Sequence, residues 1–303
     1  MDGYTSMSLI PKPMPNIIII PLLPFGSIDL IPRFYGKQRS SDWTKYWNHE
    51  TSFAEAGIAS WQEWSSRHEV ILEIATEIPS PIECGYTKSQ IDELKKFPPT
   101  ILRWLLPLAS RKKHGSDSRI AMIDADTLVS PKSPSIFEQS HTDVLLTRDR
   151  PDLNQWRKDS LSAFEPIFPG FDFNKDMYFN AGVIVLENNK LPRAFLDFTL
   201  QHSEEFLSLI NGNVGTDQTP LNFILQALVN NDELTVAFLD SRWNARIDLL
   251  LKAENPERRT WARRDSIAKI GNDLVQQNYI SHFVSAKILM PAVWQFLKQT
   301  SDD

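Results

Sequence analysis

Short apolar runs and amphipathic segments follow one another along most of the chain. The apolar runs predict strands at residues 16–21, 69–74, 119–123, 143–146, 183–186 and 235–239. Apolar residues at helical spacing predict helices at 50–68, 88–97, 100–110, 193–210 and 219–229. This alternation is typical of an α/β fold, in which helices flank a mainly parallel sheet on both faces. No Pro/Gly-rich linker divides the pattern, so we expect one domain over 15–297 preceded by a loose arm at 1–14.

Composition and charge narrow the class of protein. Of the 303 residues, 42% are hydrophobic and 23% charged, as in ordinary globular proteins. The net charge of -6 argues against a nucleic-acid partner, which would favour a basic surface. The most apolar run, at 17–23, is far shorter than the roughly 20 residues of a membrane helix, and the residues before it do not lead us to expect a signal peptide. Cys84 has no partner for an internal disulfide and is expected to be inert, which fits a reducing compartment. Because no membrane anchor is recognised, we expect a cytoplasmic protein, with peripheral contact to a membrane as an open alternative.

Two acidic residues directly follow the predicted strand at 119–123. In α/β sheets, ligands gather at the carboxyl ends of strands, and Asp124 and Asp126 lie at such an end. Two carboxylates there could hold a divalent cation, which in turn would neutralise a diphosphate. The alternative is a solvated turn in which an aspartate caps the backbone. The apolar residues on both sides favour a built site over an exposed turn.

The segment Asp124-Ala-Asp126-Thr127 resembles the metal motif of GT-A fold glycosyltransferases. The resemblance is closest to the family-8 type, which includes glycogenin and bacterial lipopolysaccharide galactosyltransferases. Further segments match that family in the same order, over about residues 50–290: the helix with Arg103, the run Asn180-Ala181-Gly182, the pair Asp217-Gln218, and His282 followed by Lys287.

The resemblance implies a transferase that moves a sugar from a nucleoside diphosphate, with uridine diphosphate and retention of configuration favoured. It implies Mn²⁺ or Mg²⁺ held by Asp124, Asp126 and His282; for Asp124 the alternative is a contact to the ribose. The remaining implied roles are donor binding by Arg103, Asp124, Ala125, Asn180, Ala181, Gly182 and Lys287, and catalysis by Asp217 and Gln218. The donor-binding half would cover about 15–127 and the acceptor half about 128–297.

Several of these residues also have a structural alternative. His282 could be a core histidine, Asn180 a turn residue and Asp217 the N-cap of the following helix. The chain also departs from the family at its last motif. Ser285 stands near the usual glycine position, Lys287 comes one residue early, and no Pro-Trp follows it.

The acceptor side is marked by fewer residues. Trp156, beside a basic residue in a predicted loop, suits stacking against a sugar, and Asn244 follows the strand at 235–239. The acceptor would be a glycan, a lipid-linked sugar or a protein. A basic cluster around Trp261 (Arg258, Arg259, Arg263 and Arg264) suits either a peripheral membrane contact or a solvated helix face.

Three other functions compete with sugar transfer. A haloacid-dehalogenase-type phosphatase also has an Asp-x-Asp after a strand, but with the threonine two residues further on and the motif near the N-terminus. A sugar-phosphate nucleotidyltransferase would show a glycine-rich basic loop after the first strand, which the sequence lacks. A degenerate transferase fold that serves as a binding or scaffold protein fits the altered last motif. The sequence does not specify an oligomeric state.

Overall fold

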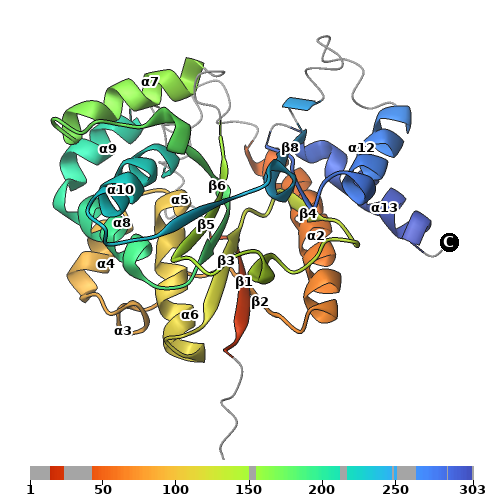
Figure 1. The fold of residues 1–303 in the computed structure, drawn as a ribbon, viewed down its shortest axis with the longest axis horizontal. Coiled ribbons are helices and arrows are strands. Elements are labelled where there is room, and N and C mark those ends of the chain that lie inside the picture. The colour runs from red at the N-terminus through yellow and green to blue at the C-terminus, as the bar shows by residue number, and fades with distance from the viewer. Residues whose placement is uncertain are drawn as a thin grey trace, which may run out of the picture.

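A six-stranded sheet forms the centre of the molecule (Figure 1). The computed structural model describes residues 14–23, 43–149, 155–211, 217–247, 249–250, 264–284 and 286–301. The strands of the sheet, in spatial order, are β2 (Ile71–Ala75), β1 (Asn16–Pro21), β3 (Arg119–Ile123), β6 (Phe179–Leu186), β5 (Val144–Arg148) and β7 (Val236–Leu239). Neighbouring strands are parallel except that β6 is antiparallel to both β3 and β5. The predicted α/β fold with a mostly parallel sheet is confirmed.

The first strand lies in the interior of the sheet because its sequence suits burial on both faces. β1 contains a run of four isoleucines, all buried, and it pairs in parallel with β2 and β3. β-branched side chains pack well on a pleated surface, and parallel strands covered on both sides read as continuous apolar runs. Successive isoleucines point to opposite faces: Ile17 and Ile19 join one hydrophobic cluster, Ile18 and Ile20 the other.

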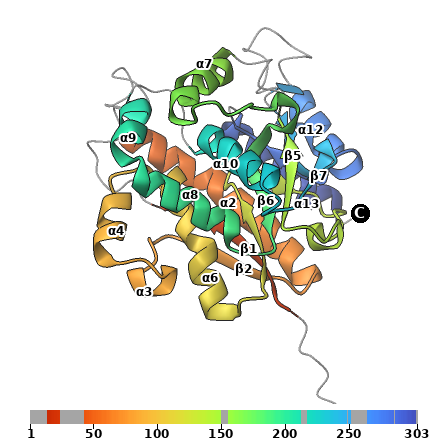
Figure 2. The same cartoon turned by 60° about the vertical axis from the view of Figure 1, so that its left-hand side comes forward.

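Helices cover both faces of the sheet. One face carries α3 (Pro81–Cys84), α4 (Lys88–Leu94), α5 (Pro99–Leu102), α6 (Leu106–His114), α7 (Gln155–Phe164), α8 (Lys190–Gln201), α9 (Ser203–Asn211) and α10 (Gln218–Asn230). Figure 2 shows α4, α6, α8 and α9 in front of this face. The other face carries α2 (Trp43–Arg67), whose Trp61 and Trp64 are fully buried against the sheet. Within the described residues, no helix has the length and apolar character needed to cross a bilayer.

A second, smaller sheet combines a short strand from the middle of the chain with two from its C-terminal part. This sheet has the order β4 (Thr127–Val129), β9 (Ile280–His282), β8 (Ala245–Arg246), and it lies beside α12 (Arg264–Gln276) and α13 (Met290–Ser301). β4 and β9 are antiparallel. The sequence did not predict this sheet, because strands of two or three residues are too short to show a period.

Two helices that were predicted as continuous are each broken into shorter segments. The helix expected over 100–110 is interrupted by a 3-10 turn at Arg103–Leu105, between α5 and α6. Pro107 explains the interruption, because it lacks an N–H and its ring crowds the carbonyl four residues earlier, that of Arg103. The helix expected over 193–210 is two helices, α8 and α9, separated at His202. Ser203 and the acidic residues that follow it are typical of a helix start.

One predicted strand is longer than its apolar core. The expectation was 183–186, whereas β6 begins at Phe179 and is buried along all eight residues. Asn180 and Gly182 therefore lie inside a strand, and Asn180 is not a turn residue.

Two predicted segments lie outside the described residues. They are the arm at 1–14, apart from Met14, and the basic cluster around Trp261, apart from Arg264, the first residue of α12.

Candidate metal and donor site

The two aspartates lie at the carboxyl end of β3, in a turn that the rest of the fold holds in place. The Asp124 amide donates to the Gly182 carbonyl at 2.8 Å, which ties the turn to β6. The Thr127 hydroxyl donates to the Asp124 carbonyl at 2.8 Å and accepts from the indole of Trp61 on α2 at 3.0 Å. The solvated-turn alternative does not fit, because Asp126 is 7% exposed.

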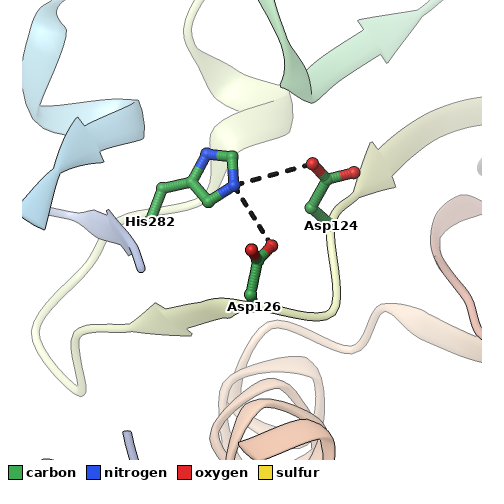
Figure 3. Close-up of side chains that lie close together, drawn as sticks. All are labelled: Asp124, Asp126 and His282. Carbon is green, nitrogen blue, oxygen red and sulfur yellow. Dashed lines mark hydrogen bonds and ion pairs between the residues drawn. The ribbon is translucent and has the colours of Figure 1, made fainter. Parts of the chain in front are cut away.

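His282 is brought to these carboxylates by the small sheet. In the antiparallel pairing of β4 with β9, His282 lies opposite Thr127. Its Nε2 lies 3.1 Å from Oδ1 of Asp126 and 3.6 Å from Oδ2 of Asp124, as Figure 3 shows. One ligand atom from each residue lies within 4.8 Å of the others. The structure thus brings together the three residues that the resemblance assigned to a metal.

The chemistry of this group suits a divalent cation. Two carboxylates and one imidazole nitrogen form a mixed oxygen and nitrogen set of the kind that divalent metals use. Burial alone would raise the pKa of Asp126, but the Lys287 ammonium and the His282 ring beside it outweigh burial and hold its pKa well below the usual range. Asp126 therefore stays ionised at neutral pH, as a metal ligand must.

Lys287 contacts the Asp126 carboxylate at the oxygen that His282 does not contact. Its Nζ lies 3.3 Å from Oδ2 of Asp126, the oxygen that does not face His282. The Lys287 side chain is 37% exposed, so one end of the group is open to solvent. Although Lys287 comes one residue earlier than in the family motif, its ammonium reaches the predicted site.

Arg103 links the aspartate turn to the start of α10. Its guanidinium bonds the Asp124 carboxylate, Asp217 Oδ2 at 2.6 Å and the Ala181 carbonyl at 3.1 Å. Burial disfavours the charged guanidinium, but the two carboxylates outweigh that effect and raise the pKa of Arg103 above its usual value. The 3-10 turn between α5 and α6 is the local structure that carries Arg103.

Asp217 occupies the N-cap position of α10 but does not act as a side-chain cap. Its Oδ2 accepts instead from Nε of Arg103 at 2.9 Å and from the Trp104 indole at 3.0 Å. Asp217 is 3% exposed. Its carboxylate therefore holds the guanidinium that also contacts Asp124.

The side-chain amide of Gln218 has a single possible orientation. Its Nε2 donates to Oδ2 of Asp149 at 3.0 Å, and its Oε1 accepts from Arg157 at 3.1 Å and from the Ala181 amide at 3.3 Å. A carboxylate only accepts, whereas a guanidinium and a backbone N–H only donate, so the amide cannot be reversed. No role was predicted for Asp149 or Arg157. The polar residues that follow β5 marked this region, but no local pattern indicated that Asp149 and Arg157 contact Gln218.

The two residues predicted for the acceptor lie in different surroundings. Trp156 is 38% exposed on α7, and the Arg157 guanidinium lies 4.9 Å from its ring centre. Asn244 ends the 3-10 turn Ser241–Asn244 and is buried between Asn180 and His282. Asn244 therefore lacks the open surface that an acceptor contact needs.

Ala125, predicted to contact the donor, lies between the two aspartates and is partly buried.

Comparisons with known proteins give likeness in structure only. No protein-family model matches the chain, and no curated protein sequence matches it. Among solved structures, galactosyltransferase LgtC with donor and acceptor sugar analogues is 12% identical, with a TM-score of 0.46 over 94% of this chain and 95% of that one. A glycosyltransferase involved in glycosylation of the major capsid of PBCV-1 is 12% identical, with a TM-score of 0.45 over 93% and 100%. Mouse xyloside xylosyltransferase 1 is 10% identical, with a TM-score of 0.41 over 90% and 98%.

Proposed function

We propose that this protein is a metal-dependent glycosyltransferase of the GT-A type, which moves a sugar from a nucleoside diphosphate to an acceptor hydroxyl. The observation that carries the proposal is the convergence of Asp124, Asp126 and His282 at the carboxyl end of a sheet strand, with the Arg103 guanidinium beside them. That position is where α/β sheets bind ligands. The diphosphate that leaves the donor is an anion, and a bound cation together with the Arg103 guanidinium would offset its negative charge.

Asp124, Asp126 and His282 would hold Mn²⁺ or Mg²⁺. A bound divalent cation supplies electrostatic stabilisation of the negative charge that develops on the departing diphosphate. The three side chains supply the ligand atoms, and Asp126 does so from a buried, ionised state. Lys287, partly exposed beside Asp126, would contact the diphosphate from the open side.

The donor sugar would lie along the start of β6 and α10. Ala125, Asn180, Ala181 and Gly182 would line it, as the sequence resemblance implies. Arg103 would orient the donor while Asp217 holds the guanidinium in place. Because preorganised charge costs no rearrangement at the moment of reaction, this buried pair suits stabilisation of a transition state.

Gln218 is the proposed group at the reacting face of the sugar. Its amide is fixed by Asp149 and Arg157, so it presents a defined dipole to the bound donor. Trp156, on the same helix as Arg157, would pack against the acceptor. We propose a uridine diphosphate donor and retention of configuration, in line with the family-8 resemblance.

The proposal is tested by thermal unfolding with nucleoside diphosphates and their sugars, with and without Mn²⁺. A ligand at 100 times its dissociation constant stabilises a fold by about 2.7 kcal/mol, which is a clear shift. We expect a shift that needs Mn²⁺, is largest for one nucleotide and is lost in Asp126→Ala. The matched control is Asp92→Ala, because Asp92 is an exposed aspartate that pairs only loosely with Lys95 at 3.6 Å.

Turnover completes the test. Release of a nucleoside diphosphate from the donor that gives the shift, with Mn²⁺ present, is expected in the parent and absent in Asp126→Ala. If no nucleotide binds although the protein unfolds cooperatively, the proposal is wrong and the degenerate scaffold is the better interpretation. Comparing the anomeric configuration of product and donor by NMR tests retention separately.

A further inference from the structure

Asn244 lies directly behind the proposed metal ligand His282. The ring Nδ1 of His282 lies 3.0 Å from Oδ1 of Asn244, on the side of the ring away from the carboxylates. Both residues are buried, with 6% of Asn244 and 3% of His282 exposed. The two ring nitrogens of His282 therefore face different partners: Nδ1 faces an amide, and Nε2 faces Asp126 and Asp124.

A backbone amide sets the direction of this hydrogen-bond chain. The Gly182 N–H donates to Oδ1 of Asn180 at 2.9 Å. Since a backbone N–H can only donate, the Asn180 amide must present its oxygen here. The same oxygen accepts from Nδ2 of Asn244 at 2.9 Å, so the Asn244 amide is oriented in turn. Its carbonyl oxygen is then the atom that faces His282, and Nδ1 must carry a proton to bond it.

The position of that proton decides what Nε2 can do. With Nδ1 protonated, Nε2 of the neutral ring keeps its lone pair and can bind a metal between the two carboxylates. In the opposite tautomer Nε2–H would donate to Asp126, and the metal-binding electron pair would be blocked. Nδ1 would then face the Asn244 carbonyl, which brings two acceptors together. The amide chain disfavours that tautomer.

We propose that Asn244 is a positioning residue that fixes the tautomer and ring direction of His282 for a divalent cation. The proposal rests on the metal site of the proposed function. It also links the ligand to β6, because the chain that orients Asn244 starts at Gly182 and Asn180, two residues assigned to the donor sugar. Partners of this kind behind a metal-bound histidine change metal affinity by about 10–100-fold when they are removed.

Mn²⁺ titration of the metal-free protein, with free Mn²⁺ followed by its EPR signal and no substrate present, tests the proposal. Asn244→Leu keeps a similar side-chain shape and removes the acceptor, so we expect affinity to fall by about 10–100-fold. Asn244→Asp keeps an acceptor for Nδ1–H, so we expect affinity at or above that of the parent. Its second oxygen would meet Oδ1 of Asn180, so we also expect a lower melting temperature. A merely structural role would not separate affinity from stability in this way.

Gln226→Leu is the matched control. Gln226 is a buried amide on α10 that bonds the backbone of Asn174 at 2.9 and 3.0 Å and does not contact His282. We expect it to lower the melting temperature and to leave Mn²⁺ affinity unchanged. If Asn244→Leu does not fold, the Mg²⁺-bound parent still tests the proposal. Its ¹⁵N–¹H spectrum should contain a slowly exchanging Nδ1–H signal that disappears in His282→Gln.

The outcomes separate this proposal from the proposed function. A parent that binds Mn²⁺, together with an Asn244→Leu variant that binds it equally well, overturns only the role of Asn244. Equal weakening in Asn244→Leu and Asn244→Asp, or in Gln226→Leu, also overturns it, because the effect would not depend on the Nδ1 acceptor. A Mg²⁺-bound parent without a protected Nδ1–H overturns it too. A parent that binds no Mn²⁺ overturns both proposals.

Discussion

Arg103 and Asp217 form a buried ion pair across 114 residues of sequence. Nε of Arg103 donates to Oδ2 of Asp217 at 2.9 Å, and a terminal guanidinium nitrogen lies 2.6 Å from the same oxygen. Both side chains are less than 10% exposed. The pair joins the 3-10 turn after α5 to the first residue before α10, and the same guanidinium contacts Asp124. The pair therefore couples α10 to the turn that carries Asp124 and Asp126.

Removing the cation of this pair should destabilise the fold strongly. Arg103→Met leaves Asp217 charged in a buried position, and breaking a buried pair in this way costs about 3–5 kcal/mol. We expect a loss of that size in the free energy of unfolding, measured by denaturant titration. In the double variant Arg103→Met/Asp217→Asn no unpaired carboxylate is left at residue 217, so the total loss should be smaller than the sum of the single losses. Additive losses would show that the two residues are not coupled.

Gly182 should tolerate no side chain, because His282 lies against it. A Cβ at this position would come within 2.4 Å of Cε1 of His282 and 2.9 Å of Oδ1 of Asn180. We expect Gly182→Ala to displace the His282 ring and to abolish Mn²⁺ binding in the EPR titration. Gly271→Ala is the control, because its Cβ would meet the Phe296 ring at 2.3 Å, between α12 and α13. It should lower the melting temperature and leave Mn²⁺ affinity intact, whereas parallel losses of affinity would indicate general unfolding.

Gly57 of α2 packs directly on the aspartate turn. Replacing glycine by alanine in an exposed helix interior stabilises a protein by roughly 1 kcal/mol. At Gly57 the new Cβ would lie 2.5 Å from the Ala125 carbonyl and 3.0 Å from the Thr127 carbonyl, both of them backbone atoms. Because overpacking costs about 1–3 kcal/mol, we expect Gly57→Ala to destabilise the fold and to weaken Mn²⁺ binding. Gln62→Ala, an exposed position on the same helix, should do neither. A more stable Gly57→Ala variant would contradict this contact.

Cys84 should be unreactive in the folded protein. Burial, aided by the charge of Glu83, raises the pKa of its thiol from 9.0 to about 12, and the thiolate is the nucleophile. We expect iodoacetamide at pH 8.5 to alkylate the unfolded chain readily and the native chain slowly, as measured by mass spectrometry. Since the pKa is higher in the folded state, the stabilisation from the neutral buried thiol is complete below about pH 9 and is lost as the pH rises towards 12. Equal alkylation rates for the two states would disprove the burial.

Much of the main sheet could be predicted from the sequence. A strand that is buried on both faces appears in the sequence as a continuous apolar run, and the isoleucine run of β1 and the apolar run of β3 each carry this signal. The predicted helix at 100–110 was wrong in continuity, although its cause, Pro107, was visible. β6 was predicted too short because Asn180 and Gly182 are not residues that favour strands.

The sequence by itself determined the α/β pattern and the short list of candidate residues, including Asp124, Asp126 and His282. Only the tertiary structure decided how they meet. His282 and Asp126 are 156 residues apart, and the pairing of β4 with β9 brings them together. In the same way, the sequence predicts an acceptor contact for Asn244, whereas the fold places it behind His282. The physical reason is that the hydrophobic pattern records which residues are buried, whereas the partner of a buried residue depends on which distant strands lie side by side, and no local pattern encodes that pairing.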